Sequence, residues 1–279
     1  MLRANDEFIP ECQGVQSAST FRGFCDKHDT ALFRPVETQP WRASKETAFL
    51  LSFRAVSFEV HAKFVAEDVG QWQKLWIDRG FDFSEQADTQ QYLEDYLTGV
   101  RLCISDQSIW KKEYDRIYLS ADYSEYHYLC VEFRPLLPIV ACGAMHVEYD
   151  FQGRSLQNLT REAPSFEHMT FNITVSDNAS IVVFGWVGDP VGPAHEFVRS
   201  FLMQPSNRLS HAVIRLAFEN FENTFMRQSW WDSLSSAVQG MIKRRTQSGG
   251  LDFERLATCL VEDNVDYFSA QPSPICIVL

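Results

Sequence analysis

The clearest structural signal in this chain is the stretch His168–Val187, which reads HMTFNITVSDNASIVVFGWV. Two runs rich in β-branched and aromatic residues flank the polar turn Ser176–Ala179, and this pattern predicts a β-hairpin. A second β-rich region covers 126–151, where Pro135 and Pro138 interrupt the strands. The two regions together predict a central antiparallel sheet of about four strands, because connections of hairpin length suffice.

N-terminal to this sheet, the sequence predicts two helices. Ser44 is a good N-cap for the first, whose apolar residues recur at spacings of three and four over 49–64. Gly70 is expected to end this helix. Asp88 and Gln91 have the spacing of a capping box, so they are expected to mark the start of the second.

C-terminal to the sheet, helices are expected at about 194–203, 206–226, 229–246 and 251–262. Ser229 and Asp232 suggest a capping box for the third of them. Helices, then strands, then helices indicate an α+β fold, in which N-terminal and C-terminal helices flank the sheet and cover one face of it. Residues 1–43 are rich in Gly and Pro and are expected to form an irregular N-terminal arm, followed by a single α+β domain over 44–279.

The composition indicates a globular chain and excludes some functions. Its 279 residues are 45% hydrophobic and 14% aromatic, which is enough for a large core. The formal charge is −12 and the only compact basic run is Lys243–Arg245, so extended nucleic-acid binding is disfavoured. Seven scattered cysteines and an acidic, polar start favour reduced thiols and a cytoplasmic location. The apolar runs are shorter than the ~20 residues of a transmembrane helix.

Cys25 and His28 form a Cys-x-x-His motif in the N-terminal arm. A thiolate and an imidazole at this spacing can share one tetrahedral zinc ion, and Asp29 and Cys12 are the candidate further ligands. The motif therefore predicts a small structural zinc site in the arm. One alternative is a buried cysteine beside a hydrogen-bonded histidine. Another is a nucleophilic Cys–His pair, which needs an orienting group and an oxyanion hole as well.

The segment 19–37, STFRGFCDKHDTALFRPVE, resembles a segment found in a group of bacterial proteins. These proteins also share the helix sequence FLLSFRA, at 49–55 here, and a Glu-Asn…Trp-Trp stretch. The latter stands here as Glu222-Asn223 and Trp230-Trp231. The group has no established activity. The resemblance therefore implies a bacterial origin and a cytoplasmic location, and it assigns no catalytic residue.

The same Glu-Asn…Trp-Trp stretch suggests a ligand pocket. Glu222 and Asn223, together with His211, would supply polar groups beside Trp230 and Trp231, whose indoles offer stacking area and one N–H donor each. The alternative is that both indoles belong to the core, where large aromatic residues are common.

Two other sets of charged or titratable residues have a pattern of interest. Arg215 and Glu219 lie four residues apart, so they are expected to form an ion pair on the helix surface. His127, His146 and Glu148 lie in the predicted strand region. In one interpretation of this pattern, strand pairing brings these three residues together, and they act as metal ligands or as acid and base groups.

The last four residues, Cys276-Ile277-Val278-Leu279, match a prenylation signal in form. The residues before them are acidic rather than polybasic, and a single lipid usually needs a second membrane signal. A packed apolar tail or an edge strand is therefore favoured for this segment.

Two classes of function follow from these patterns. The first is a bacterial, cytoplasmic binding or regulatory domain, with zinc in its arm and a protein or a small molecule as its partner. The second is a metal-assisted hydrolase or nuclease, with acidic and histidine ligands assembled across the sheet and the last helices. The sequence leaves open whether the chain is an enzyme, and the absence of a complete catalytic motif favours the first class.

Overall fold

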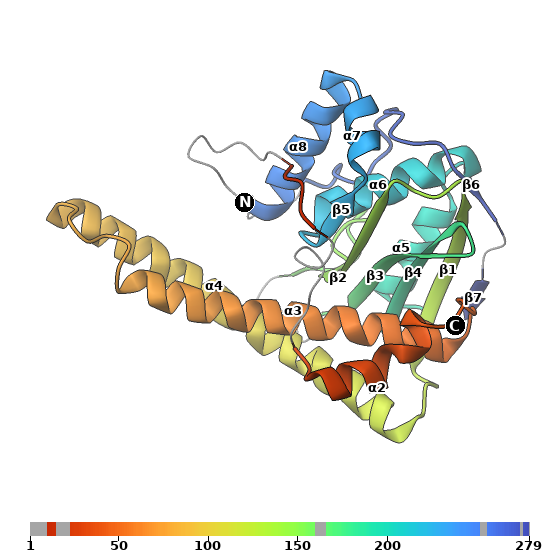
Figure 1. Ribbon diagram of the computed structural model, residues 1–279, viewed down its shortest axis with the longest axis horizontal. Coiled ribbons are helices and arrows are strands. Elements are labelled where there is room, and N and C mark those ends of the chain that lie inside the picture. The colour runs from red at the N-terminus through yellow and green to blue at the C-terminus, as the bar shows by residue number, and fades with distance from the viewer. Residues whose placement is uncertain (1–9, 15–22, 160–165, 252–255, 274–275, 279) are drawn as a thin grey trace. The chain divides into compact units, whose positions relative to one another are not determined.

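The structure is a computed structural model that describes residues 10–14, 23–159, 166–251, 256–273 and 276–278 (Figure 1). By its contacts the chain forms two compact units: residues 1–55 with 122–279, which we call the sheet unit, and residues 56–121, which we call the hairpin unit. The sequence predicted an arm over 1–43 and one domain over 44–279. No helix in the described ranges is long and apolar enough to cross a membrane.

The sheet is antiparallel, as predicted. Its strands are β1 (Tyr126–Arg134), β2 (Ile139–His146), β3 (His168–Ser176), β4 (Ala179–Val187), β5 (Thr224–Met226), β6 (Gln271–Pro272) and β7 (Cys276–Val278). They lie in the order β5-β2-β3-β4-β1-β6, and β7 also pairs with β1. The four long strands are those that the sequence predicts, and the three short ones extend the sheet beyond β2 and β1.

The predicted hairpin is formed by β3 and β4. Ser176 pairs with Ala179, so the turn contains only Asp177 and Asn178. Both have a positive φ, 50° and 59°, as a type I′ turn requires, and Asp and Asn tolerate this region better than most residues. The turn therefore helps to set the register at the centre of the sheet.

The helices are α2 (Asp26–Glu37), α3 (Lys45–Lys74), α4 (Phe83–Ser120), α5 (Pro193–Leu202), α6 (Leu209–Asn220), α7 (Gln228–Ser233) and α8 (Ser236–Leu251), with a 3-10 turn, η1 (Ser206–Arg208). Ser44 caps α3 as predicted, because its Oγ accepts a hydrogen bond from the Thr47 N–H at 3.2 Å. Together with the antiparallel sheet, these helices give the predicted α+β class.

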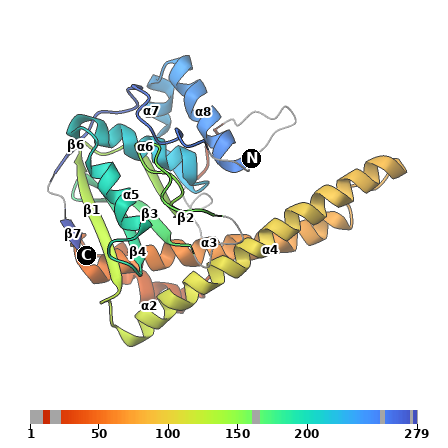
Figure 2. The ribbon, with the colours of Figure 1, turned by 180° about the vertical axis from the view of Figure 1, so that it is seen from behind.

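Helices cover both faces of the sheet, whereas one covered face was expected (Figure 2). On one face, Phe184 of β4 packs against Phe201 of α5, with ring centroids 5.1 Å apart. On the other, Phe49 in the first turns of α3 lies 5.3 Å from the ring of Tyr126 on β1. Two-sided coverage explains why β1, β3 and β4 are buried along most of their length instead of at alternate residues.

The N-terminal arm is more regular than predicted, because residues 26–37 form α2. Phe33 is fully buried, and its ring lies 5.6 Å from that of Phe24 and 6.3 Å from that of Phe53. Pro35, one of the prolines for which an irregular arm was expected, lies in the last turn of the helix. Aromatic packing between segments distant in sequence therefore outweighs the local signal for irregular structure.

Gly70 does not end α3, which continues to Lys74. A Cβ at Gly70 would lie 2.7 Å from Leu97 Cδ2 of α4, so the glycine permits close packing of two helices. The capping box of α4 is also earlier than predicted. Asp82 Oδ1 accepts a hydrogen bond from the Glu85 N–H at 2.9 Å, and this pair takes the role expected of Asp88 and Gln91.

The C-terminal region is less helical than predicted. Residues 224–226, expected at the end of a long helix, form β5 against β2. Ser229 and Asp232 do not form a capping box, since α7 has no side-chain cap. Residues 256–262 contain turns where a helix was expected. The expected edge strand does form, because β7 pairs with β1.

Candidate functional site

Two of the predicted pocket residues, His211 and Trp230, meet at Tyr267. The Tyr267 N–H donates to His211 Nδ1 at 3.0 Å, and the Trp230 indole N–H donates to the Tyr267 carbonyl at 3.1 Å. Both side chains are buried. They therefore hold the backbone of Tyr267 from its two sides.

The other three predicted pocket residues make different contacts. Glu222 is exposed and Trp231 is half-buried. Asn223 donates to the Cys142 thiol on β2, and its carbonyl accepts from the Cys142 N–H at 3.2 Å. Two surface hollows, of about 210 Å³ beside β5 and about 10 Å³ beside the end of β2, are lined by other residues. A ligand pocket at this junction stays a prediction.

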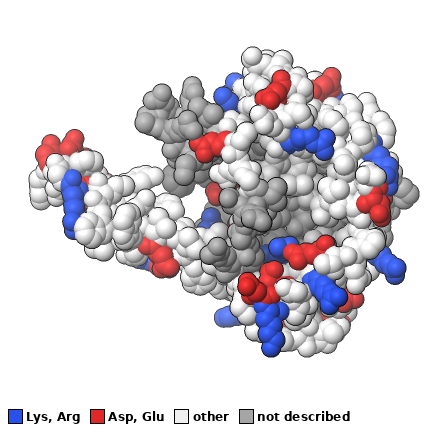
Figure 3. All heavy atoms as spheres, in the orientation of Figure 1, with Lys and Arg blue, Asp and Glu red and all other residues white. Residues whose placement is uncertain are grey.

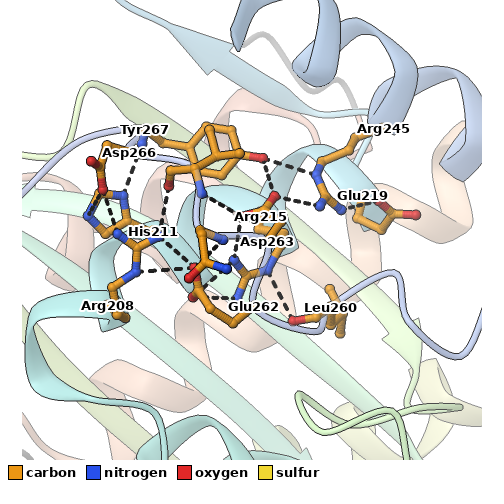
Figure 4. Close-up of polar contacts among 12 residues, drawn as sticks. Arg208, His211, Arg215, Glu219, Arg245, Leu260, Glu262, Asp263, Asp266 and Tyr267 are labelled. Carbon is orange, nitrogen blue, oxygen red and sulfur yellow. Dashed lines mark hydrogen bonds and ion pairs between the residues drawn. The ribbon is translucent and has the colours of Figure 1, made fainter.

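Polar side chains occupy one face of the buried helix α6. His211, Arg215 and Glu219 recur every four residues and so share a face, and their exposed fractions are 1%, 0% and 5%. The expectation of a surface ion pair between Arg215 and Glu219 is therefore wrong. Charged groups at this depth need partners that compensate for the loss of water, and each of the two has such partners elsewhere (Figure 4).

Arg215 binds the C-terminal segment 256–273, which we call the strap. Its Nε donates to the Leu260 carbonyl at 3.0 Å. Its Nη1 lies 3.3 Å from Glu262 Oε2 and 3.2 Å from Asp263 Oδ1. One arginine on α6 therefore satisfies three acceptors of the strap.

Arg245 of α8 closes the network. It lies 2.9 Å from Glu219 and 2.8 Å from Asp263, and the Tyr267 hydroxyl donates to Asp263 at 2.7 Å. Burial alone would raise the pKa of Asp263, but hydrogen bonds from Tyr267 and Arg245 outweigh it and keep that pKa below its usual value. Burial and the bond to Asp263 raise the pKa of Tyr267 to about 12. The network fastens the strap to α6 and α8.

Cys25 and His28 lie together at the start of α2, with Sγ 3.2 Å from Nδ1. Both residues are exposed, and Asp29 is half-buried. Within the described ranges, no three His, Cys, Asp or Glu side chains form a group that could hold a metal ion, so neither Asp29 nor Cys12 completes this pair. Zinc in the arm stays a prediction.

His127 and His146 lie on strands that the sheet keeps apart. β4 and β3 separate β1 from β2, which amounts to about 14 Å at the usual spacing of strands. The expected trio with Glu148 is therefore not formed. His146 instead lies opposite His168 on β3. Burial, and to a smaller extent the charge of His146, lower the pKa of His168 to about 3.

The hairpin unit contains the feature that sequence reasoning missed. Its two helices, the later part of α3 and the whole of α4, are joined by residues 75–82 and run antiparallel to each other (Figure 1). Leu93, Leu97 and Val100 recur at spacings of four and three and are buried, and Gly70 packs against Leu97. These residues form the contact between the helices.

Ion pairs join the two helices along one side of the hairpin. Arg101 Nε lies 2.9 Å from Glu67 and Arg101 Nη1 lies 3.5 Å from Glu94, which also pairs with Lys74. The pairs Arg101–Glu67 and Lys74–Glu94 link α3 to α4, whereas the pair Arg101–Glu94 lies within α4. This side of the hairpin is therefore polar.

The opposite side of the hairpin is apolar. Two positions along a helix correspond to about 200° around it, so residues two before or after an ion-pairing residue face away from it. Such residues are Val65 and Val69 around Glu67, Trp72 and Trp76 around Lys74, and Tyr92 and Tyr96 around Glu94. We call these six apolar residues the apolar flank. Their exposed fractions run from 43% to 70%.

The flank belongs to a wider apolar surface. Of the nineteen exposed large apolar side chains in the described ranges, fourteen lie in the hairpin unit, including Phe81 and Phe83 in and after the connection. The sequence contains a signal for this exposed apolar surface. Over 64–77, the apolar residues lie on several sides of the helix instead of in one stripe. A helix of that kind needs more than one contact surface.

Comparison with protein-family models, with curated proteins and with solved structures gives no match to this chain. The bacterial origin implied by the segment 19–37 stays a prediction. The function is therefore argued from the geometry alone.

Proposed function

We propose that this chain is a docking protein, in which the hairpin unit binds a partner macromolecule through the apolar flank. The observation that carries the proposal is the gathering of six large, half-exposed side chains on one side of a helical hairpin. Contiguous exposed apolar surfaces with polar surroundings mark interaction sites. Trp and Tyr, which make up four of the six residues, are the residues that most often dominate binding energy.

The hairpin holds the flank in a fixed arrangement before any partner binds. The ion pairs of Glu67, Lys74 and Glu94 join the helices on the far side, and Gly70 lets them approach closely. The Arg79 guanidinium lies 3.5 Å from the centroid of the Trp76 ring, which restrains that indole. A preorganised surface loses less conformational entropy on binding, which favours affinity.

The alternative function, a metal-assisted hydrolase or nuclease, has no contact among the described residues in its favour. The buried titratable groups of α6 and the strap bind each other and fill structural roles. Binding is therefore the class of function that the geometry supports best.

The test uses an uncharged amphipathic peptide of Leu and Ser with a fluorescent label, whose binding is followed by anisotropy. Wild type should bind it, and Trp72→Ser combined with Tyr92→Ser should weaken binding at least tenfold. Each aromatic anchor at an interface contributes about 1–2 kcal/mol, and 1.4 kcal/mol corresponds to a factor of ten.

The matched control is Val191→Ser, because Val191 is 67% exposed on the sheet unit. This variant should bind the peptide as wild type does, and circular dichroism should show all three forms equally folded. Failure of wild type to bind, or equal affinity in all three forms, contradicts the docking function.

A further inference from the structure

The hairpin unit is strongly acidic around its apolar flank. Residues 67–95 include eight Asp and Glu but only two Lys and Arg. Both cations already have partners, since Lys74 pairs with Glu94 and Arg79 lies over the Trp76 ring. In Figure 3, residues other than Lys, Arg, Asp and Glu cover most of the hairpin face in view, with both acidic and basic side chains among them.

Three exposed carboxylates border the flank directly. Asp68 lies four residues before Trp72, Asp88 lies four before Tyr92, and Asp95 lies three after Tyr92. Residues three or four apart are neighbours on a helix surface. The apolar surface is therefore edged by negative charge on both helices.

The spacing of the flank suits a helix as its occupant. On α3 and the turn after it, Val65, Val69, Trp72 and Trp76 follow each other at intervals of four, three and four, which is the spacing of a coiled-coil seam. Tyr92 and Tyr96 form a second row on α4. Two antiparallel helices with apolar rows on the same side can take a third helix between them, as in helix-in-groove recognition.

Resting on the proposed docking function, we propose that the occupant is an amphipathic helix whose apolar face is bordered by Lys and Arg. Such a helix places cations beside Asp68, Asp88 and Asp95 while its apolar residues cover the flank. A second copy of this chain brings the same acidic border, and an anionic lipid surface is also negative. Repulsion between like charges disfavours both.

The test compares labelled amphipathic peptides of one length, with Leu on the apolar face and Lys, Ser or Glu at every other position. At about 50 mM salt, the Lys peptide should bind wild type at least tenfold more tightly than the Ser peptide, and the Glu peptide should bind most weakly. At about 0.5 M salt the three affinities should converge, because the screening length falls to a few ångströms.

The variant Asp68→Asn, Asp88→Asn, Asp95→Asn removes the acidic border and keeps the flank. It should bind the Lys peptide no more tightly than the Ser peptide.

A control variant makes the same change in net charge on the sheet unit, through Glu46→Gln, Glu222→Gln and Asp232→Asn, three exposed positions. It should change the affinity for the Lys peptide by less than about twofold, because it leaves Asp68, Asp88 and Asp95 in place beside the flank. An equal loss in the control means that overall charge, and not the border, attracts the peptide, and this overturns the inference.

The two proposals can fail separately. If the three peptides bind alike and Trp72→Ser weakens all of them, docking stands and the basic helix is wrong. If none binds, the docking function itself fails. Sedimentation experiments test for self-association, and vesicles of anionic lipid test for membrane binding. If wild type self-associates or binds the vesicles, and Trp72→Ser abolishes that association or binding, the occupant is a second copy of the chain or a lipid surface, and the inference is overturned.

Discussion

Replacing Arg215 with Met tests whether the buried network fastens the strap. The Arg215 side chain is fully buried, and it pairs with Glu262 and Asp263. Met fills a similar volume, but each of these two carboxylates then has one hydrogen-bond donor fewer. Removing one partner from a buried ion pair costs about 3–5 kcal/mol. Because Glu262 keeps Arg208 and Asp263 keeps Arg245, the loss should lie near the lower end, at about 3 kcal/mol.

Urea unfolding followed by circular dichroism measures this loss, and thermal unfolding should show a Tm lower by about 6–12 °C, at about 2–4 °C per kcal/mol for a domain of this size. The control is Arg199→Met, because Arg199 is 58% exposed and its ion pair with Glu196 lies on the surface. It should change stability by less than about 0.5 kcal/mol. A loss below about 1 kcal/mol for Arg215→Met would refute the role assigned to the network.

Two further predictions concern pH and packing. The folded chain keeps His168 neutral, because burial lowers its pKa to about 3, whereas the unfolded chain takes up the proton below pH ~6.5. The contribution of His168 to the free energy of unfolding is therefore fully present above pH ~6.5. It falls by about 1.4 kcal/mol for each pH unit below that value. His168→Gln should remove about 2 kcal/mol of the loss between pH ~6.5 and ~5 in urea unfolding, and an unchanged loss contradicts this. Gly185→Ala puts a Cβ against the Tyr126 hydroxyl and should cost about 1–3 kcal/mol, whereas Gly99→Ala on α4 meets nothing within 4 Å and should add about 0.5–1 kcal/mol. Thermal unfolding checks both, and effects of the same sign would be evidence against the packing at Gly185.

The central sheet could be predicted because its signals are local. The two residues of the turn, Asp177 and Asn178, favour the backbone that a tight hairpin needs, and the flanking runs have high β propensity. The short strands could not be predicted in the same way. β5 has only three residues, and it is a strand because β2 lies beside it.

The same limit applies to helix ends and to the buried network. Gly70 is typical of a helix end unless a second helix packs against it, and that helix begins thirteen residues later in the sequence. Arg215 and Glu219 have the spacing of a surface pair. Their burial depends on the strap, which follows more than 35 residues after Glu219. Local spacing cannot distinguish a surface pair from two buried residues that each bind a distant segment.

The apolar flank shows where a sequence rule could be made sharper. A helix in contact with one neighbour needs one apolar stripe, and the later part of α3 carries apolar residues outside the stripe that meets α4. Such an excess has two explanations, which are full burial in a core or a surface kept for a partner. The positions of the charges distinguish them. In a fully buried helix every carboxylate needs a buried cation, whereas Asp68, four residues before Trp72, is exposed to water. A second apolar row with acidic residues three or four positions away therefore indicates a docking surface with a basic partner, and the peptide experiments test that rule directly.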